Sequence, residues 1–207
     1  MSEETSTSRP ETTLIVGLGN PDSEYADTRH NLGFDCVRAL ASRHGVDIKK
    51  KRWRSLVGHA AASGTWFVLP QTYMNLSGEA VKAALRDVPV PPARVWVVHD
   101  ELDLPLCRMR IRVGGSGAGH NGVLSIMRAL GSPDFVRFRV GIGKPSRRPG
   151  QSGVHYVLGR FTKAEAASIE NIVAGVADAL ELALDAGVER AMDRYNRAGA
   201  LGCEESR

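Results

Sequence analysis

The sequence predicts a single α/β domain of three layers, in which a twisted, mixed β-sheet is flanked by helices. Short apolar stretches, typical of buried strands, alternate with longer stretches in which apolar residues recur at helical spacing. The 207 residues suit one domain, and the sequence contains neither an internal repeat nor a long linker. We expect the domain to span residues 13–197, with a flexible N-terminal tail over residues 1–12 and a flexible C-terminal tail over residues 198–207.

Turn and capping residues indicate where the elements begin and end. Gly45 follows a helical stretch and is placed to stop it, and Gly64 lies in a turn between two strands. Thr162 is followed three residues later by Glu165, a spacing typical of a helix N-terminus. The expected elements, in chain order, are a strand over 13–16, a helix over 31–44, strands over 56–61 and 65–69, a helix over 79–85, strands over 95–98 and 108–113, a helix over 123–130, a strand over 136–142, and helices over 162–184 and 188–196.

The composition excludes several classes of protein. Hydrophobic residues make up 43% of the chain and charged residues 24%, an ordinary balance for a globular domain. We expect no membrane-spanning helix and no signal peptide, because long apolar runs are absent and the N-terminus is rich in Ser, Thr and Glu. Cys36, Cys107 and Cys203 are far apart and odd in number, which argues against a disulfide framework or a zinc knuckle. These features predict a protein of the reducing cytoplasm.

One segment of the chain is strongly basic. Residues 104–163 contain eleven lysines or arginines and one acid, so the net charge of +4 combines +10 here with −6 elsewhere. So uneven a distribution favours an anionic partner, although basic residues on exposed strand faces would give the same composition. Arg110, Arg112 and Arg139 alternate with apolar residues on the expected strands, so their side chains should share one exposed face.

Two polar loops follow buried strands and are candidates for an active site. The loop after residue 16 reads GLGNPDSEYADTRHN and contains Asn20 and His30, and the loop after residue 98 reads HDELDLP and contains Asp100. Catalytic groups of α/β sheets gather beyond the C-terminal ends of strands. An imidazole from one loop beside a carboxylate from the other would form a general base, whereas most isolated histidines near a helix N-terminus are only capping or solvated.

Other active-site chemistries have little support in the sequence. The nearest approach to a serine nucleophile elbow, around Ser116, ends in the wrong residue. The glycine loop of residues 114–122 contains the G-x-G-x-x-G spacing of a dinucleotide site, but no acid for a ribose occurs over residues 135–164. The zinc motif H-E-x-x-H is absent, and the carboxylates after His99 suggest an orienting group rather than metal ligands. We therefore expect neither a cofactor nor a metal.

The polar loops belong to five segments that together resemble bacterial peptidyl-tRNA hydrolases. The segments occur in the family's order and read LIVGLGNPDSEYADTRHNLGF, LPQTYMNLSGEAV, VHDELDLP, GGSGAGHNG and FVRFRVGIGKP. With the closing YVLGRF and GVERAMDRYN they cover nearly everything over residues 14–196. Two departures, Ala118 in the glycine loop and LPLC where LPPG is commoner, could alter loop mobility or tRNA docking.

The resemblance implies an activity and a role for each site residue. The enzyme would hydrolyse the ester between the peptide, or another N-blocked aminoacyl group, and the 3′-terminal ribose of peptidyl-tRNA, and so recycle tRNA from abortive translation. His30 would be the general base that activates water, Asp100 would orient it, and Asn20 would act beside them. The family's substrate-binding positions fall on Tyr25, Met74, Asn75 and Asn121, and its tRNA phosphate contacts on Arg110, Arg112 and Arg139.

Two other functions remain open on the sequence alone. A non-catalytic RNA-binding protein on the same scaffold would keep the basic segment, but it would not need both His30 and Asp100. A hydrolase of small-molecule esters would keep this pair and would not need the basic segment. The expected partner is peptidyl-tRNA, held through its acceptor end and CCA terminus by a monomer that contacts no membrane.

Overall fold

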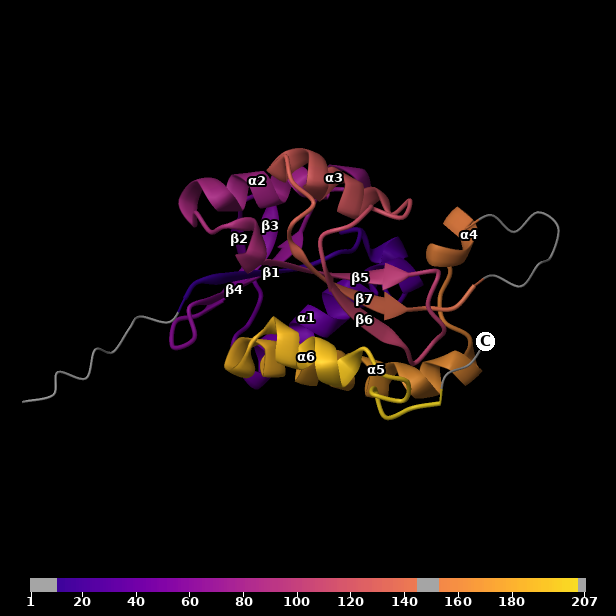
Figure 1. Ribbon diagram of the computed structural model, residues 1–207. Coiled ribbons are helices and arrows are strands. Elements are labelled where there is room, and N and C mark those ends of the chain that lie inside the picture. Colours follow the sequence, from indigo (N-terminus) through magenta and orange to yellow (C-terminus); the bar gives the residue numbers. More distant parts are fainter. Residues whose placement is uncertain (1–10, 145–152, 205–207) are drawn as a thin grey trace, which may run out of the picture.

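Seven strands form one sheet through the centre of the molecule (Figure 1). The computed structural model describes residues 11–144 and 153–204, and all structural statements concern these residues. The strands are β1 (Thr13–Gly17), β2 (Lys50–Arg52), β3 (Ser55–Ala60), β4 (Thr65–Pro70), β5 (Val95–Glu101), β6 (Met109–Val113) and β7 (Val136–Gly141). Their order is β2-β3-β4-β1-β5-β7-β6, with β4, β1, β5 and β7 parallel and both edges antiparallel. This is the mixed sheet that the sequence predicts.

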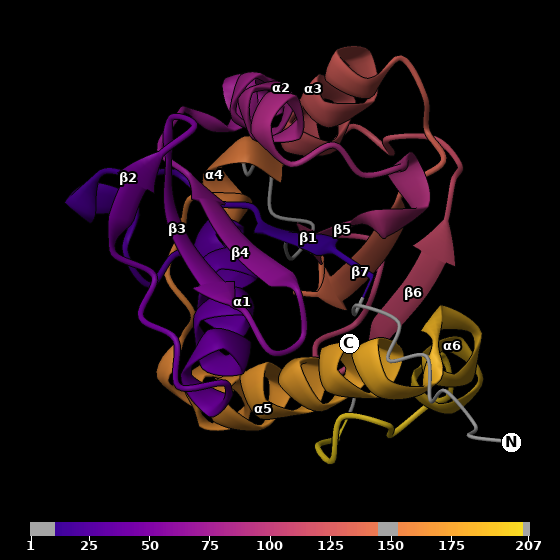
Figure 2. The same cartoon turned by 90° about the vertical axis from the view of Figure 1, so that its left-hand side faces the viewer.

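Helices cover both faces of the sheet, as the three-layer prediction requires (Figures 1 and 2). Two helices lie on one face, α2 (Ser77–Asp87) and α3 (Asn121–Leu130), and three lie on the other, α1 (Leu32–Arg43), α5 (Lys163–Ala186) and α6 (Val188–Tyr195). A short helix, α4 (Gly153–Val157), and the 3₁₀ turns η1 (Ser23–Tyr25), η2 (Arg29–Asn31), η3 (Met74–Leu76) and η4 (Pro92–Arg94) complete the fold. The helix start at Thr162 has the capping box that its spacing with Glu165 predicts.

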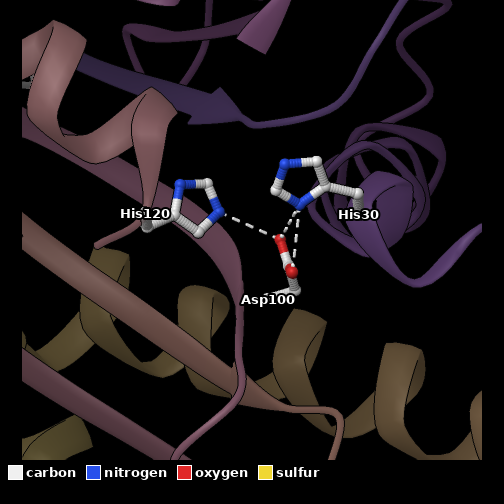
Figure 3. A group of neighbouring side chains, drawn as sticks. All are labelled: His30, Asp100 and His120. Atoms are coloured by element: carbon white, nitrogen blue, oxygen red, sulfur yellow. Dashed lines mark hydrogen bonds and ion pairs between the residues drawn. The ribbon is translucent and has the colours of Figure 1, made fainter. Parts of the chain in front are cut away.

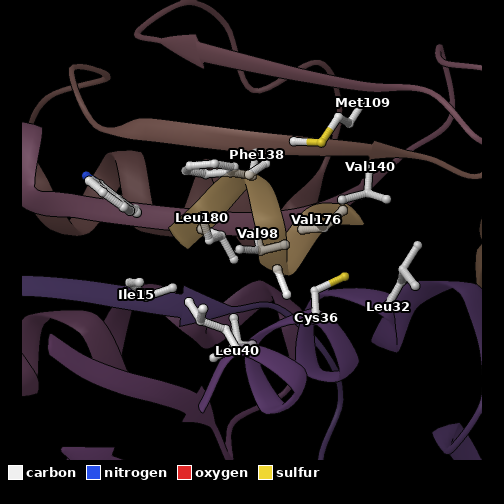
Figure 4. Packing of buried hydrophobic residues seen from close by; sticks show 14 of the residues in the cluster. Ile15, Leu32, Cys36, Leu40, Val98, Met109, Phe138, Val140, Val176 and Leu180 are labelled. Carbon is white, nitrogen blue, oxygen red and sulfur yellow. The ribbon is translucent and has the colours of Figure 1, made fainter. Parts of the chain in front are cut away.

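The central strands are apolar on both faces because each face is buried by helices. Along β5, Val95 and Val97 contact the core under α2 and α3, while Trp96 and Val98 contact the core under α1 and α5. Figure 4 shows the second core, where side chains of β1, β5 and β7 meet those of α1 and α5. Continuous apolar runs of this kind are typical of parallel strands that are covered on both sides.

The edge of the sheet contains a strand that the sequence does not predict. Strand β2 consists of Lys50, Lys51 and Arg52, and its side chains are exposed or half-buried. A short, charged edge strand has no apolar periodicity, and its charges discourage pairing with another chain. Strand β5 is also longer than expected, since it continues through Asp100 to Glu101. Asp100 therefore lies within a strand rather than in the loop that follows it.

The C-terminal segment corrects one expectation from the sequence. Leu201, in the tail expected over residues 198–207, is 4% exposed and packs over Gly175 of α5. Cys203 forms a disulfide with Cys107, with 5.6 Å between their Cα atoms, which contradicts the expectation of no disulfide. Most of the expected N-terminal tail, residues 1–10, lies outside the described residues. Among the helices described, none is long and apolar enough to cross a membrane.

Candidate active site

The site lies where loops from the ends of parallel strands meet. Strand β1 pairs with β4 on one side and β5 on the other, so the loops that follow these strands open at the same edge of the sheet. Gly33, in the first turn of α1, is packed so closely that a Cβ there would lie 2.4 Å from the carbonyl oxygen of Val98. Only glycine permits this approach. It brings the turn η2, which carries His30, against the C-terminal half of β5, which carries Asp100.

His30 and Asp100 form the pair that the sequence predicts (Figure 3). Nδ1 of His30 lies 2.9 Å from Oδ1 and 3.1 Å from Oδ2 of Asp100. Asp100 accepts, so Nδ1 carries the proton of the neutral ring and Nε2 is left as a base. Burial alone would raise the pKa of Asp100, but the neighbouring His30 and His120 hold it below its ordinary value. Asp100 is therefore a carboxylate, suited to orient an imidazole and to stabilise its charged form.

His120 is a second imidazole on the same carboxylate. Its Nε2 lies 3.0 Å from Oδ1 of Asp100, and its ring centre lies 5.0 Å from that of His30. His99 lies behind it, with its Nδ1 donating to the backbone carbonyl of Asp100 at 2.8 Å. Burial, followed by the proximity of His120, lowers the pKa of His99 well below its ordinary value, so His99 is neutral.

Asn20 is held in one orientation by the loops around it. Its Oδ1 accepts from the backbone N–H of Met74 at 2.9 Å, which leaves Nδ2 as the donor side of the amide. Asn31 fixes the backbone of the same residue, because its Oδ1 accepts from the N–H of Asn20 at 2.8 Å and its Nδ2 donates to the Asn20 carbonyl at 3.0 Å. Asn20 thus presents a rigid N–H donor in the wall that also contains His30.

His30, Asp100 and Asn20 line a cavity of about 700 Å³. Three of the expected substrate-binding residues line it as well, namely Met74, Asn75 and Asn121. Tyr25 is not among the lining residues and lies half-buried in η1. Tyr73 was not singled out from the sequence, yet it lines the cavity and is 54% exposed. Its position next to Met74 is the only sequence signal that could have indicated it.

The basic residues occupy one face of β6 and β7, but their surroundings differ. Arg110 lies opposite Arg139 in the antiparallel pair, and Arg112 lies opposite Arg137. Arg110 and Arg112 are exposed, as expected. The expectation of exposure is wrong for Arg139, whose side chain is 18% exposed and whose Nε donates to Oε2 of Glu101 at 2.9 Å. Neighbouring strands β5 and β7 bring this acid beside it, so part of its charge is neutralised within the fold.

His30, Asp100 and His120 also form the one group of possible metal ligands found in the described part of the chain. One ligand atom from each residue lies within 4.8 Å of the others. The sequence contains no signal for this group because the three residues come from separate loops. Each imidazole directs a ring nitrogen at Asp100 in a hydrogen bond, so a cation would have to displace both protons. The arrangement fits a hydrogen-bonded base better than a metal centre.

Comparison with known proteins agrees with this geometry. The family model described as Peptidyl-tRNA hydrolase matches residues 14–201. Curated peptidyl-tRNA hydrolases from Chloroflexus aggregans and Syntrophotalea carbinolica are 47% and 44% identical, cover 88% of this chain, and are themselves covered over 98% and 96%. A crystal structure of peptidyl-tRNA hydrolase from Acinetobacter baumannii matches with a TM-score of 0.81 and 34% identity over 94% of this chain and 96% of that one. This chain therefore belongs to the peptidyl-tRNA hydrolase family, whose members hydrolyse peptidyl-tRNA.

Proposed function

We propose that His30 is the general base that cleaves the ester between the peptide and the 3′-terminal ribose. Its Nε2 takes a proton from a water molecule as the water attacks the ester carbonyl. The proton then passes to the ribose oxygen as the ester C–O bond breaks. Asp100 keeps the ring in the productive tautomer and stabilises the imidazolium between these steps. The observation that carries the proposal is the His30–Asp100 contact of 2.9 Å in the wall of the cavity.

Asn20 acts on the charge that develops during the attack. The tetrahedral intermediate places a negative charge on the former carbonyl oxygen, and a fixed N–H donor stabilises it. The bond from Met74 N–H to Oδ1 of Asn20 supports this role, because it turns Nδ2 away as the free donor side. An amide does not titrate, so it serves over the whole pH range in which His30 is a base.

Neutral amides provide a physical reason for selecting N-blocked substrates. Asn75 and Asn121 line the cavity, and each can form a hydrogen bond with a peptide N–H or C=O whatever the side chain of the bound residue. Met74 forms an apolar wall of the same cavity. An aminoacyl-tRNA with a free α-amino group would have to lose the hydration of an ammonium ion in the same place. Burying an unpaired charge costs far more than burying a hydrogen-bonded amide.

The tRNA is held outside the cavity. Tyr25 contacts the CCA terminus, and exposed Arg110 and Arg112 contact phosphates of the acceptor end, with Arg139 contributing less because Glu101 pairs with it. The enzyme acts in the cytoplasm, where ribosomes produce its substrate. One copy of the chain is sufficient for the proposed reaction, because His30, Asp100 and Asn20 line the same cavity.

A substrate panel tests the proposal against the two rival functions. Purified protein is assayed with N-acetylated aminoacyl-tRNA, the same aminoacyl-tRNA with a free amine, and a nitrophenyl ester, all with EDTA present. We expect rapid hydrolysis of the first substrate only. An RNA-binding protein would cleave none of the three, a general esterase would cleave the nitrophenyl ester, and loss of activity in EDTA that added metal restores would indicate a metal enzyme.

A further inference from the structure

Asp100 has a hydrogen-bond partner that the mechanism above does not use. Nε2 of His120 lies 3.0 Å from Oδ1 of Asp100, the same oxygen that Nδ1 of His30 approaches to 2.9 Å. Figure 3 shows the carboxylate between the two rings. The side chain of Asp100 is 2% exposed, so its carboxylate interacts with these two imidazoles rather than with bulk water.

Helix α3 determines which nitrogen of His120 carries the proton. His120 is the N-cap of α3, and its Nδ1 accepts from the backbone N–H of Gly122 at 3.2 Å and of Val123 at 3.4 Å. A nitrogen that accepts from these amides cannot carry a proton itself, so the single proton lies on Nε2 and faces Asp100. His99 packs edge-on against the ring, with 4.7 Å between ring centres, and limits its rotation.

We infer that His120 is a positioning residue for the reaction, which donates to Asp100 from the N-terminus of α3 and so sets both the rotation and the charge of the carboxylate. The inference rests on the proposed function of His30 and Asp100. It differs from that proposal because His120 contacts neither the water nor the ester in this mechanism. It acts only through Asp100.

The rotation of Asp100 is not fixed by His30 alone. Nδ1 of His30 lies 2.9 Å and 3.1 Å from the two carboxylate oxygens, so either oxygen could accept its proton. His120 bonds to Oδ1 only, and its own ring is held by α3. His30 is therefore oriented by Asp100, Asp100 by His120, and His120 by the first turn of α3. A helix is a more rigid support for such a set than a loop.

The charge of Asp100 is divided between two donors. A carboxylate with one N–H partner concentrates its attraction on the imidazolium that forms at His30, whereas a second donor weakens that attraction. Loss of His120 would therefore change how strongly Asp100 attracts the imidazolium that forms at His30, as well as the rotation of the carboxylate. The other titratable groups that face this set are His99 and Glu101 of β5, with Arg137 of β7 near His99.

Two substitutions separate the bond to Asp100 from the cap of α3. The amide of asparagine can occupy the position of Nδ1, so His120→Asn keeps a good N-cap and loses the bond to Asp100. The amide of glutamine can occupy the position of Nε2, so His120→Gln keeps a donor at Asp100 and weakens the cap. The measurements are kcat and KM for N-acetylated aminoacyl-tRNA, and thermal unfolding of each variant.

We expect His120→Asn to lower kcat about tenfold or more, with KM within about twofold and thermal stability near wild type. His120→Gln should keep most of kcat and melt at a lower temperature. A wild-type kcat in His120→Asn, with wild-type enzyme active and His30→Ala inactive, would overturn the inference and leave the proposed function intact. If His30→Ala stayed active, both would fail.

Discussion

At the scale of single residues, the proposed mechanism depends on the carboxylate of Asp100. Burial raises the pKa of Asp100, but His30 and His120 outweigh this effect and hold the pKa below its ordinary value. Asp100 is therefore a charged carboxylate at the pH at which His30 acts as a base. An asparagine at this position has nearly the same shape, but it cannot stabilise a positive ring. The ring nitrogen facing it could also accept from the asparagine N–H₂, which would favour the wrong tautomer.

We therefore expect Asp100→Asn to lower kcat for peptidyl-tRNA by about 10²-fold or more, with KM little changed, since the lost interaction is strongest in the transition state. Steady-state kinetics on N-acetylated aminoacyl-tRNA measures both constants. Asp47→Asn is a matched control, because Asp47 is exposed, pairs with Lys49 and does not line the cavity. An unaltered kcat in Asp100→Asn would mean that another group orients the base.

At the scale of elements, Arg29 joins the turn that carries His30 to the start of α5. Its guanidinium donates to the carbonyls of Gly159 and Arg160 and to Oε2 of Glu165, the last at 2.6 Å, and it lies over the rings of Tyr156 and Phe161. The side chain of Arg29 is 6% exposed. Its removal would take a donor from the carbonyl of Arg160 and would leave Oε2 of Glu165 with the backbone N–H of Thr162 alone.

We expect Arg29→Met to lower the free energy of unfolding by about 3 kcal/mol, because a largely buried ion pair is broken and several hydrogen bonds of the guanidinium are lost. Urea unfolding measures the change. Arg43→Met is the matched control, since its partners Asp178 and Glu181 are 54% and 38% exposed and its loss should cost about 1 kcal/mol or less. Equal losses in the two variants would show that Arg29 is not a structural link.

A second link between elements is the disulfide that fixes the C-terminal segment to the loop before β6. The two cysteines are separated by 96 residues, so the bond closes a long loop in the unfolded chain. In the loop-entropy description such a cross-link stabilises the fold by about 4–5 kcal/mol. Cys107 has a φ of 64°, a left-handed conformation that is unfavourable for any residue except glycine.

Reduction of this bond should therefore lower the melting temperature of the wild-type protein measurably. Differential scanning calorimetry with and without dithiothreitol provides the measurement, and Cys203→Ser provides the control, because the reductant has no bond to break in that variant. The same melting temperature for oxidised and reduced wild-type protein would contradict a stabilising bond.

The sequence predicts elements and motif residues well and long-range pairings poorly. Apolar periodicity is enough to predict β5 and α5, since both are buried, but not β2, whose exposed side chains have no period. The positions after buried strands indicated where His30 and Asp100 could meet, and the resemblance to the family singled them out from the other polar residues of those loops. The bonds of Arg139 to Glu101 and of Cys107 to Cys203 depend on which strands and helices become neighbours, and the sequence does not contain that information locally.

At the scale of the whole molecule, the charge asymmetry should govern how tightly tRNA binds. Each phosphate contact releases counterions, so it steepens the fall of affinity with salt by about 0.7–0.9 in a log–log plot. Arg110 and Arg112 are both exposed on the edge strand β6, and Arg139 is partly neutralised. The two exposed arginines are therefore the better pair to replace.

We expect Arg110→Gln combined with Arg112→Gln to raise KM for peptidyl-tRNA and to flatten its salt dependence by about 1.4–1.8 in that plot. Cleavage of a minimal peptidyl-nucleoside ester should be unchanged, since it has no distant phosphates. The control removes two exposed charges from α2, with Lys82→Gln and Arg86→Gln, and should leave both quantities near wild type. Identical salt slopes in the two double variants would place the tRNA elsewhere.

The central claim is that Nε2 of His30 removes the proton from the attacking water. The most direct test is the single-turnover rate of N-acetylated aminoacyl-tRNA hydrolysis by His30→Ala, with enzyme in excess and tRNA affinity measured in parallel. We expect a rate at least about 10²-fold below wild type, with tRNA affinity and melting temperature nearly unchanged. A variant that folds, binds tRNA and retains more than about a tenth of the wild-type rate would contradict it, because a general base contributes more than that.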